Sequence, residues 1–182
     1  ELDSEALLYR ESAAAPGDRD PAAGAWFTLC FCAVYLGVAD AALAESVRYA
    51  QLRVPTALGR AIGSLEPVQR RLGAAQLALR VAGSFLDGVA GAWDLAPVDA
   101  RPALGADVLA AKLQVASAAV SAVDQCLHVV GGPAMRRDLA LERRFRDVRA
   151  VLFHPPTEDQ GLALLGRLAL ARDRVPESPR TV

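Results

Sequence analysis

Cysteine is scarce in this sequence, which excludes a protein held together by disulfide bonds. Three cysteines occur in 182 residues, and an odd count argues against a disulfide framework and favours a reducing, cytoplasmic location. Cys30 and Cys32 have no second pair nearby, so no metal site is expected. We expect these two thiols and that of Cys126 to be buried.

A surplus of either charge is also missing, which excludes a strong electrostatic partner. Lys and Arg number 20 and Asp and Glu number 21, giving a formal net charge of −1. Nucleic acids and anionic membrane surfaces attract clusters of positive charge. We therefore expect neither of them as a partner.

The sequence has no uncharged run long enough to span a bilayer. The run of residues 25–39, AWFTLCFCAVYLGVA, is shorter than the roughly 20 residues a span requires, and Asp40 and Glu45 follow it directly. The first residues also lack the basic start and small-residue cleavage site of a signal peptide. A buried helix is the better interpretation of this run.

What the sequence does contain predicts helices. Hydrophobic residues make up 53% of the chain, enough for one sizeable core, and the abundance of alanine and leucine favours helix over strand. We expect long helices over residues 24–53, after a cap at Ser64, and over residues 102–130, joined by short connections. These features predict an all-α fold, an up-and-down antiparallel helical bundle.

The bundle is expected to occupy residues 24–174. Residues 1–23 read as a linker or the remnant of a preceding domain, with at most a short strand over residues 6–9, and residues 175–182 as a disordered tail. Helices of nearly thirty residues, about 40 Å long, carry broad apolar faces that need partners on several sides. We therefore expect helices to pack between subunits of a homo-oligomer.

The periodicity also assigns faces to the helices. On the first helix Glu45 and Arg48 are expected to point outward, and on the second and third helices narrow polar stripes are expected to face solvent. A capping box is predicted between Thr157 and Gln160. The positions expected to face the core on the first helix and on the shorter helix near residue 145 are Phe27, Phe31, Val34, Val38 and Ala42, and Leu141, Phe145, Val148 and Leu152.

Residues 112–149 carry the most specific pattern in the chain. Lys112 stands alone among Ala, Val and Leu, the segment HVVGG ends a long helix at Gly132, and ERRFRDVR follows over residues 142–149. This spacing resembles the C-terminal helical domain of the acyl-CoA dehydrogenase superfamily. Farther back, the segment YAQLR, which ends at Arg53, and Gln69 resemble two more positions of that domain.

The resemblance implies a cofactor and a set of contacts. In that family FAD lies between the subunits of a tetramer, and the substrate is an acyl-CoA or another small molecule. Carried over by position, Arg53 and Gln69 reach the pyrophosphate and adenosine portion, and the glycine turn lets the backbone approach the flavin. The cofactor-binding residues that the resemblance implies are Arg53, Gln69, His128, Gly131, Gly132 and Thr157. One departure from the family pattern is Thr56-Ala57, where a Phe-Gly pair is usual.

The segment FHPPTE, residues 153–158, departs from the family where its catalytic base stands. The usual continuation ends Glu-Gly-Thr, and counting along the chain places Pro155 at the glutamate and Thr157 at the threonine. Proline has no side-chain base and therefore removes no proton. Some members carry the base on the first long helix, at or near Phe27, which has no carboxylate either. Ordinary acyl-CoA dehydrogenation therefore lacks its usual base.

A histidine at this turn resembles another branch of the superfamily, the two-component flavin monooxygenases. Those enzymes use reduced flavin, such as reduced FMN, and oxygen, and a neutral imidazole donates a hydrogen bond and moves a proton near pH 7. On this interpretation His154 is the catalytic residue. A third alternative is a non-catalytic subunit that only packs helices against an active partner.

Ordinary structural roles stand beside each of these assignments. Arg53 also fits a solvated cation at a helix end, and Gly131 with Gly132 also fits a helix C-cap. His128 also fits the polar stripe of its helix, and His154 the end of the preceding helix. The sequence leaves these alternatives open.

Overall fold

The computed structural model describes residues 21–172. The five α-helices are α1 (Pro21–Leu52), α2 (Glu66–Leu95), α3 (Gly105–Val130), α4 (Leu141–Arg149) and α5 (Glu158–Arg172). Four short 3-10 turns connect them: η2 (Ile62–Ser64), η3 (Arg101–Leu104), η4 (Gly132–Met135) and η5 (Ala150–Phe153). Residues 21–172 contain no strand, which confirms the all-α prediction. The expected linker strand and the C-terminal tail lie outside the described residues.

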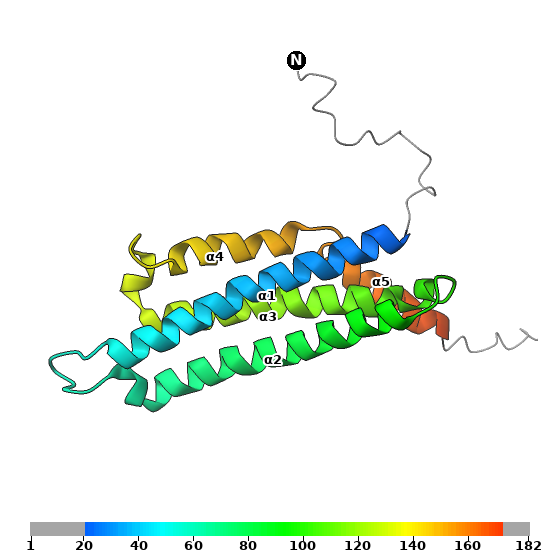
Figure 1. The fold of residues 1–182 in the computed structure, drawn as a ribbon. Coiled ribbons are helices and arrows are strands. Elements are labelled where there is room, and N and C mark those ends of the chain that lie inside the picture. The colour runs from blue at the N-terminus through cyan, green and yellow to red at the C-terminus, as the bar shows by residue number, and fades with distance from the viewer. Residues whose placement is uncertain (1–20, 173–182) are drawn as a thin grey trace, which may run out of the picture.

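The three long helices form an antiparallel layer that determines the shape of the molecule. α1, α2 and α3 run side by side and alternate in direction, while α4 lies along α1 and α3 and returns toward the beginning of α1 (Figure 1). α5 packs at that same end against α3. The up-and-down arrangement therefore follows the prediction, and the segment between α4 and α5 lies beside α1.

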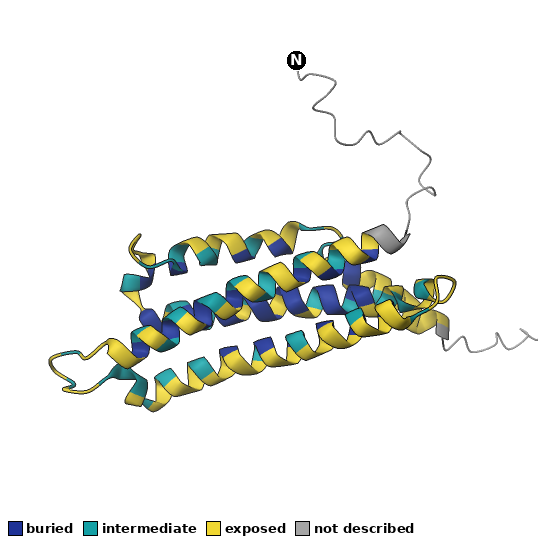
Figure 2. Ribbon diagram, in the orientation of Figure 1, coloured by how far each residue is buried: buried dark blue, intermediate teal, exposed yellow. Residues whose placement is uncertain are grey.

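Alanine is the most frequent buried residue among those that the structure describes. Buried positions line the facing sides of the three long helices, while their outer faces are exposed (Figure 2). α1 differs from its predicted core face: Phe27 and Val34 are 63% and 64% exposed. Ala42 is buried as predicted, and the other positions that α1 buries are Ala25, Leu29, Cys32, Ala39, Leu43, Ser46 and Ala50. The prediction was wrong for Phe27 and Val34 because α1 is apolar on nearly every side, so periodicity does not single out one face.

Helix ends follow the sequence signals in part. Gly131 caps α3 with φ +71°, and its N–H donates to Leu127 O at 2.7 Å. Ser64 does not cap α2, because Leu65 occupies the N-cap and the Ser64 hydroxyl donates to Ala61 O. Thr157 N–H donates to Gln160 Oε1 at 3.0 Å, which is one of the two hydrogen bonds of the predicted capping box.

Two of the burial predictions for single side chains were also wrong. Cys30 is exposed, whereas Cys32 and Cys126 are buried as expected. Leu152 is exposed and Val151 is buried in its place, since the chain tightens to a 3-10 turn after α4 and shifts the apolar register by one residue.

Two helical segments, Gly24–Leu52 and Arg101–Val130, are long and apolar enough by length and composition to cross a membrane. The run of residues 25–39 is short, but the helix that contains it has 32 residues. Within the bundle, 39% and 44% of the residues in their most apolar windows are buried. Core helices of a globular bundle meet the same criterion, and both segments supply buried residues to the two core clusters.

Candidate functional site

The segment of residues 153–157 runs from the last residue of η5 to the start of α5 and is held by side chains from two different helices. Lys112 Nζ, on α3, donates to Pro156 O at 2.7 Å. Tyr35 OH, on α1, lies 2.9 Å from His154 Nε2. The turn is therefore fixed from both sides, and we name it the His154 turn.

Lys112 is the most unusual of these groups because it is buried. Its side chain is 1% exposed, although lysine is almost never fully buried without a partner. Burial lowers the pKa of Lys112, and the neighbouring Cys32 and Glu158 oppose that shift. Burial also raises the pKa of the Cys32 thiol to about 12, so this cysteine stays protonated at neutral pH. Lys112 therefore acts as a donor that holds the turn.

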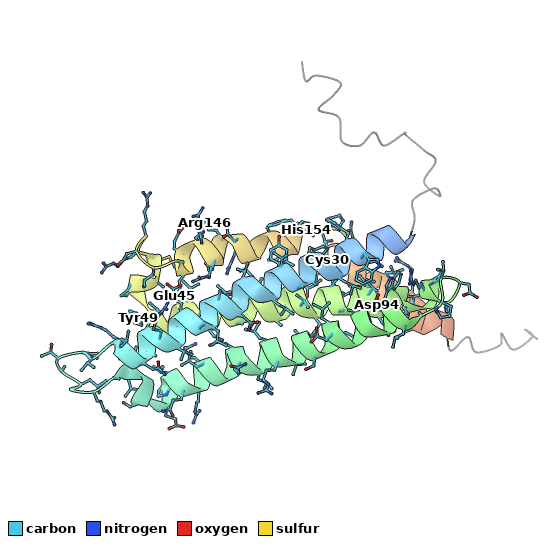
Figure 3. The ribbon with its side chains drawn as sticks, viewed as in Figure 1. Cys30, Glu45, Tyr49, Asp94, Arg146 and His154 are labelled. Atoms are coloured by element: carbon cyan, nitrogen blue, oxygen red, sulfur yellow. The ribbon has the colours of Figure 1, made fainter. Side chains whose placement is uncertain are left out.

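His154 is oriented by two aromatic rings of α1. Its ring stacks on Phe31 at 4.8 Å between centroids, with an interplanar angle of 25°. Burial, and second the charge of Asp147, raise the pKa of Tyr35, so its phenol keeps its proton at neutral pH. When His154 is neutral and Tyr35 donates, Nε2 is the acceptor and the imidazole proton lies on Nδ1. His154 is half-buried where the chain leaving α4 lies next to α1 (Figure 3).

The turn itself carries no carboxylate. Pro155 is exposed and Phe27, the other position considered for a base, points into solvent. Glu158 and Asp159 occupy the first turn of α5, where acidic residues complement the helix dipole. Glu158 does line a groove of about 410 Å³ along the polar stripe of α3, together with Lys112. Within residues 153–157, His154 is the one ionisable side chain.

The other predicted cofactor residues lie at the opposite end of the bundle. Arg53 directly follows α1 and is exposed, and its carbonyl accepts Ile62 N–H at 3.0 Å. Gln69, in the first turns of α2, donates through Nε2 to Gly63 O at 3.0 Å. Arg53 also lines a hollow of about 310 Å³ with Arg48, which is exposed. This end therefore combines cations with the positive end of the α2 dipole.

The glycine turn lies at that same end. His128 is exposed in the last turn of α3, and Gly131 and Gly132 are both exposed just beyond it. A Cβ built on either glycine meets no atom within 4 Å. Nothing in the described part of the chain therefore requires Gly132, whereas the backbone of Gly131 does require glycine.

The structure thus divides the predicted residues into two groups. Lys112 contacts the His154 turn, and Gly131 follows 19 residues later along α3, which is about 28 Å at 1.5 Å per helical residue. One group contains His154 and Thr157, and the other contains Arg53, Gln69, His128, Gly131 and Gly132. The two groups lie too far apart for one small ligand to contact both within one chain.

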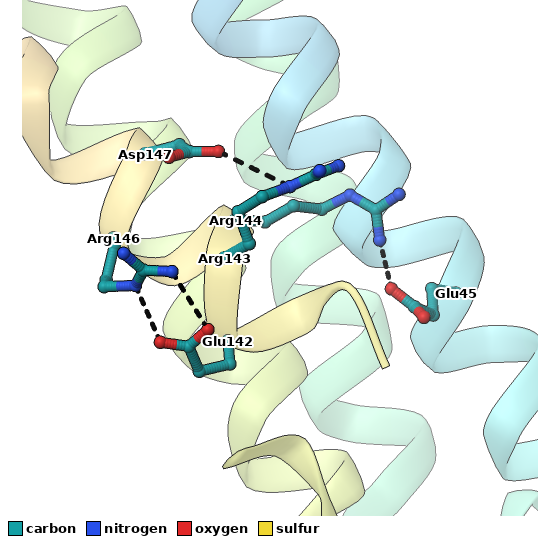
Figure 4. Close-up of polar contacts among 6 residues, drawn as sticks. All are labelled: Glu45, Glu142, Arg143, Arg144, Arg146 and Asp147. Carbon is teal, nitrogen blue, oxygen red and sulfur yellow. Dashed lines mark hydrogen bonds and ion pairs between the residues drawn. The ribbon is translucent and has the colours of Figure 1, made fainter. Parts of the chain in front are cut away.

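Ion pairs between helices hold α4, and with it the His154 turn, against the bundle. Glu45 of α1 pairs with Arg144 and accepts Ala140 N–H at 3.2 Å, so it faces inward, contrary to the prediction (Figure 4). Arg149 Nη2 donates to Asp124 Oδ1 of α3 at 2.7 Å. These contacts hold α4 against α1 and α3, next to the position where His154 contacts Tyr35 of α1.

The two ion pairs predicted within α4 are present. Glu142 pairs with Arg146 at 2.6 Å and Arg143 with Asp147 at 3.9 Å, both at i,i+4 spacing (Figure 4). The arginine members are largely exposed, so these pairs contribute little to stability. Among the described residues no group of three His, Cys, Asp or Glu side chains is arranged to hold a metal ion.

The sequence of this bundle matches a known protein family. Residues 29–158 match the family described as acyl-CoA dehydrogenase, C-terminal domain. The match covers more than half of the sequence, so this chain belongs to that family.

Three similar proteins support the assignment. YdbM of Bacillus subtilis (strain 168), an acyl-CoA dehydrogenase by name, is 40% identical over 137 residues, covering 75% of this chain and 35% of its own. The mitochondrial short-chain specific acyl-CoA dehydrogenase of Bos taurus is 30% identical over 135 residues, covering 73% of this chain and 31% of its own. The structure of PigA with FAD and proline has a TM-score of 0.71 and 23% identity, over 82% of this chain and 37% of that one.

The chain spans about a third of the length of the two curated relatives. PigA is similar in fold, and its flavin is a property of that protein. Sequence reasoning missed the orienting Tyr35, and it named Lys112 as a motif position without giving it a role at the His154 turn. The isolated lysine in an apolar helix was visible as a signal, but no pattern in the sequence paired Tyr35 with His154.

Proposed function

We propose that this chain is the C-terminal domain of an FAD-dependent oxidoreductase, in which it forms one wall of the flavin site and the interface between subunits. The observation that carries the proposal is the division of the candidate residues into two groups about 28 Å apart along α3. A second copy of the chain would bring its opposite end toward the His154 turn. A homotetramer or dimer is therefore part of the proposal.

The residues at the two ends fit the two portions of FAD. Arg53, with Arg48 in the same hollow, and the N-terminus of α2 suit the pyrophosphate, because both supply positive charge. Gln69, His128 and the exposed glycine turn offer hydrogen bonds and close backbone approach. Thr157 of the other copy would lie near the flavin ring. When bound, FAD would supply an acceptor for a hydride.

The proposed enzyme lacks the usual carboxylate base for acyl-CoA dehydrogenation. Removing a proton beside a thioester carbonyl needs a base within hydrogen-bond reach, and Pro155 offers none. Glu158 is exposed at the start of α5 and faces the groove on α3. Ordinary dehydrogenation of an acyl-CoA is therefore not expected, and the small-molecule substrate is of another kind or reacts without this base.

One observation favours a second candidate function, a flavin-dependent monooxygenase supplied with reduced FMN or FAD. His154 is stacked on Phe31 and bonded to Tyr35, which is the arrangement of a positioned imidazole rather than of a free helix end. With Nε2 occupied by Tyr35, the Nδ1–H of His154 would be the donor to an oxygen species. On this candidate His154 is the proton donor.

The test uses the protein expressed from its complete gene, assayed in two ways. Acyl-CoA with an artificial electron acceptor measures dehydrogenation, and reduced flavin with oxygen measures monooxygenation. The first proposal expects FAD in the purified oligomer and no acyl-CoA oxidation. The second expects an oxygen-dependent product that His154→Ala abolishes.

Each outcome separates the candidates. An unchanged oxygen-dependent activity in His154→Ala would contradict the role of His154. Rapid acyl-CoA oxidation would contradict the missing base. A colourless oligomer that binds neither FAD nor FMN would leave only the third interpretation, a subunit that packs helices without catalysis.

A further inference from the structure

A cavity of about 380 Å³ lies where α1 begins and α2 ends, and α3 and α5 complete its wall. This volume falls at the lower end of the range of ligand sites, roughly 300–1,000 Å³. None of the residues assigned to the flavin lines it, and the His154 turn contributes only Pro156. The cavity is therefore distinct from the proposed flavin contacts, and it shares Lys112 with the His154 turn.

Most of its wall is apolar. Val108 and Leu109 of α3 and Leu164 and Leu168 of α5 line it, together with small residues of α1. Leu164 and Leu168 are one turn apart and are 39% and 43% exposed, although leucine of this size gains about 25 cal/mol per Å² on burial. An apolar segment of a ligand would bury this surface.

The polar groups of the wall are hydrogen-bond donors, and two of them are cations. Trp93 is 2% exposed, yet its Nε1–H is buried without a partner among the described residues. Lys112 Nζ finds one acceptor there, Pro156 O, and has three hydrogens to donate. Arg101 Nε donates to Ala96 O at 3.2 Å, and its guanidinium lies 5.9 Å from the centre of the Trp93 ring.

Carboxylate side chains are missing from the described part of this wall. Among residues 21–172 no Asp or Glu lines the cavity, and Glu158 lines the groove along α3 instead. The wall's one hydroxyl, Thr28, already donates to Gly24 O at 2.9 Å. A buried donor without a partner costs about 1–3 kcal/mol, so the cavity favours an occupant with acceptor oxygens and negative charge.

We propose that this cavity binds a small aliphatic monocarboxylate, with its carboxylate toward Arg101, Lys112 and the Trp93 N–H and its chain between the leucines of α3 and α5. A carboxylate supplies several lone pairs and a charge opposite to the two cations, and an alkyl chain matches the leucine wall. A nucleotide or a polyol would leave the apolar side uncovered.

The test is calorimetric titration of the complete protein with sodium octanoate and, separately, with octan-1-ol. The two ligands share an eight-carbon chain and differ in the charged head group. We expect octanoate to bind at one site and octan-1-ol to bind at least about tenfold more weakly, the loss typical of one charge-assisted hydrogen bond. Tryptophan fluorescence should change on octanoate binding, since Trp93 lines the cavity.

Matched variants locate the site. Arg101→Gln should weaken octanoate about tenfold, whereas Arg80→Gln, an exposed arginine in the middle of α2, should leave it unchanged. Trp93→Phe should weaken octanoate and not octan-1-ol. Equal affinity for the two ligands, no saturable octanoate binding, or equal effects of Arg101→Gln and Arg80→Gln would each overturn the proposal. The comparison of the two ligands needs no variant.

Discussion

Gly131 and Gly132 are neighbours of identical size whose substitution separates a structural role from a cofactor role. Gly131 has φ +71° and ψ −147°, a region that residues with a Cβ rarely adopt, whereas Gly132 has no positive φ. A Cβ on either residue would meet no atom within 4 Å, so packing does not distinguish them. The difference between the two alanine variants is therefore a difference in backbone conformation.

Gly131→Ala is expected to lower the free energy of unfolding by about 1–3 kcal/mol, the cost of holding a non-glycine residue in such a region. Gly132→Ala is expected to leave it unchanged or to raise it by about 0.4–1 kcal/mol, because alanine restricts the unfolded chain. In a protein of this size each kcal/mol shifts the Tm by about 2–4 °C.

The assay combines urea unfolding, followed by circular dichroism, with flavin absorbance of the complete protein. If the glycine turn contacts the cofactor, Gly132→Ala should lose flavin while keeping its stability. Equal destabilisation by the two variants would refute the backbone argument for Gly131. Full flavin content in Gly132→Ala would refute the close approach of the cofactor at that residue.

Three further predictions concern the packing around the site. Burial lowers the folded-state pKa of Lys112, so the native state binds fewer protons than the unfolded chain between that pKa and the ordinary value of 10.5. In urea unfolding, the free energy of unfolding of wild type minus that of Lys112→Met should therefore rise as the pH rises toward 10.5. A difference that does not change with pH would contradict a buried, charged Lys112. Glu45→Gln should lower the free energy of unfolding by about 1–3 kcal/mol, because it leaves a half-buried arginine of α4 without its partner. Asp138→Asn, in an exposed pair, should lower it by under about 1 kcal/mol. Equal losses of stability in the two variants would refute this ranking. A Cβ on Gly161 would lie 3.0 Å from the Leu113 methyl carbons, so Gly161→Ala should be less stable than Gly166→Ala, in open space on the same helix, by roughly 1 kcal/mol in thermal unfolding.

The fold was largely predictable from the sequence because its signals are local. Long runs of Ala, Val and Leu interrupted at Pro55, Gly59 and the Gly131 cap determine where helices begin and end. α4 was predicted with its inner side at Leu141 and Val148, both fully buried. Its charged outer face made that periodicity unambiguous.

The inward face of α1 was not predictable in the same way. Phe27 and Val34 are more hydrophobic than the alanines that α1 buries, so hydrophobicity alone does not rank its faces. The exposed apolar side of α1 is consistent with a surface that other parts of a longer protein cover. Glu45 faces inward because it pairs with Arg144, which is 99 residues away in the sequence.

The site was predicted as a set of residues but not as a geometry. Motif positions named His154 and Thr157 together with Arg53 and Gly131, and only the structure separates them to opposite ends. Tyr35 and His154 are 119 residues apart in the chain, so no local pattern joins them. Long-range pairs of this kind depend on how helices are placed, which periodicity does not specify.

The flavin content of the complete protein tests the central claim most directly, with wild type compared against Arg53→Gln and Arg60→Gln. Arg53 lines the hollow at the end of α1, whereas Arg60 is an exposed arginine of the following loop. The claim predicts that wild type and Arg60→Gln purify with FAD and that Arg53→Gln loses most of it. Equal flavin absorbance per chain in all three proteins, or none in any, would contradict the claim that this domain forms a wall of a flavin site.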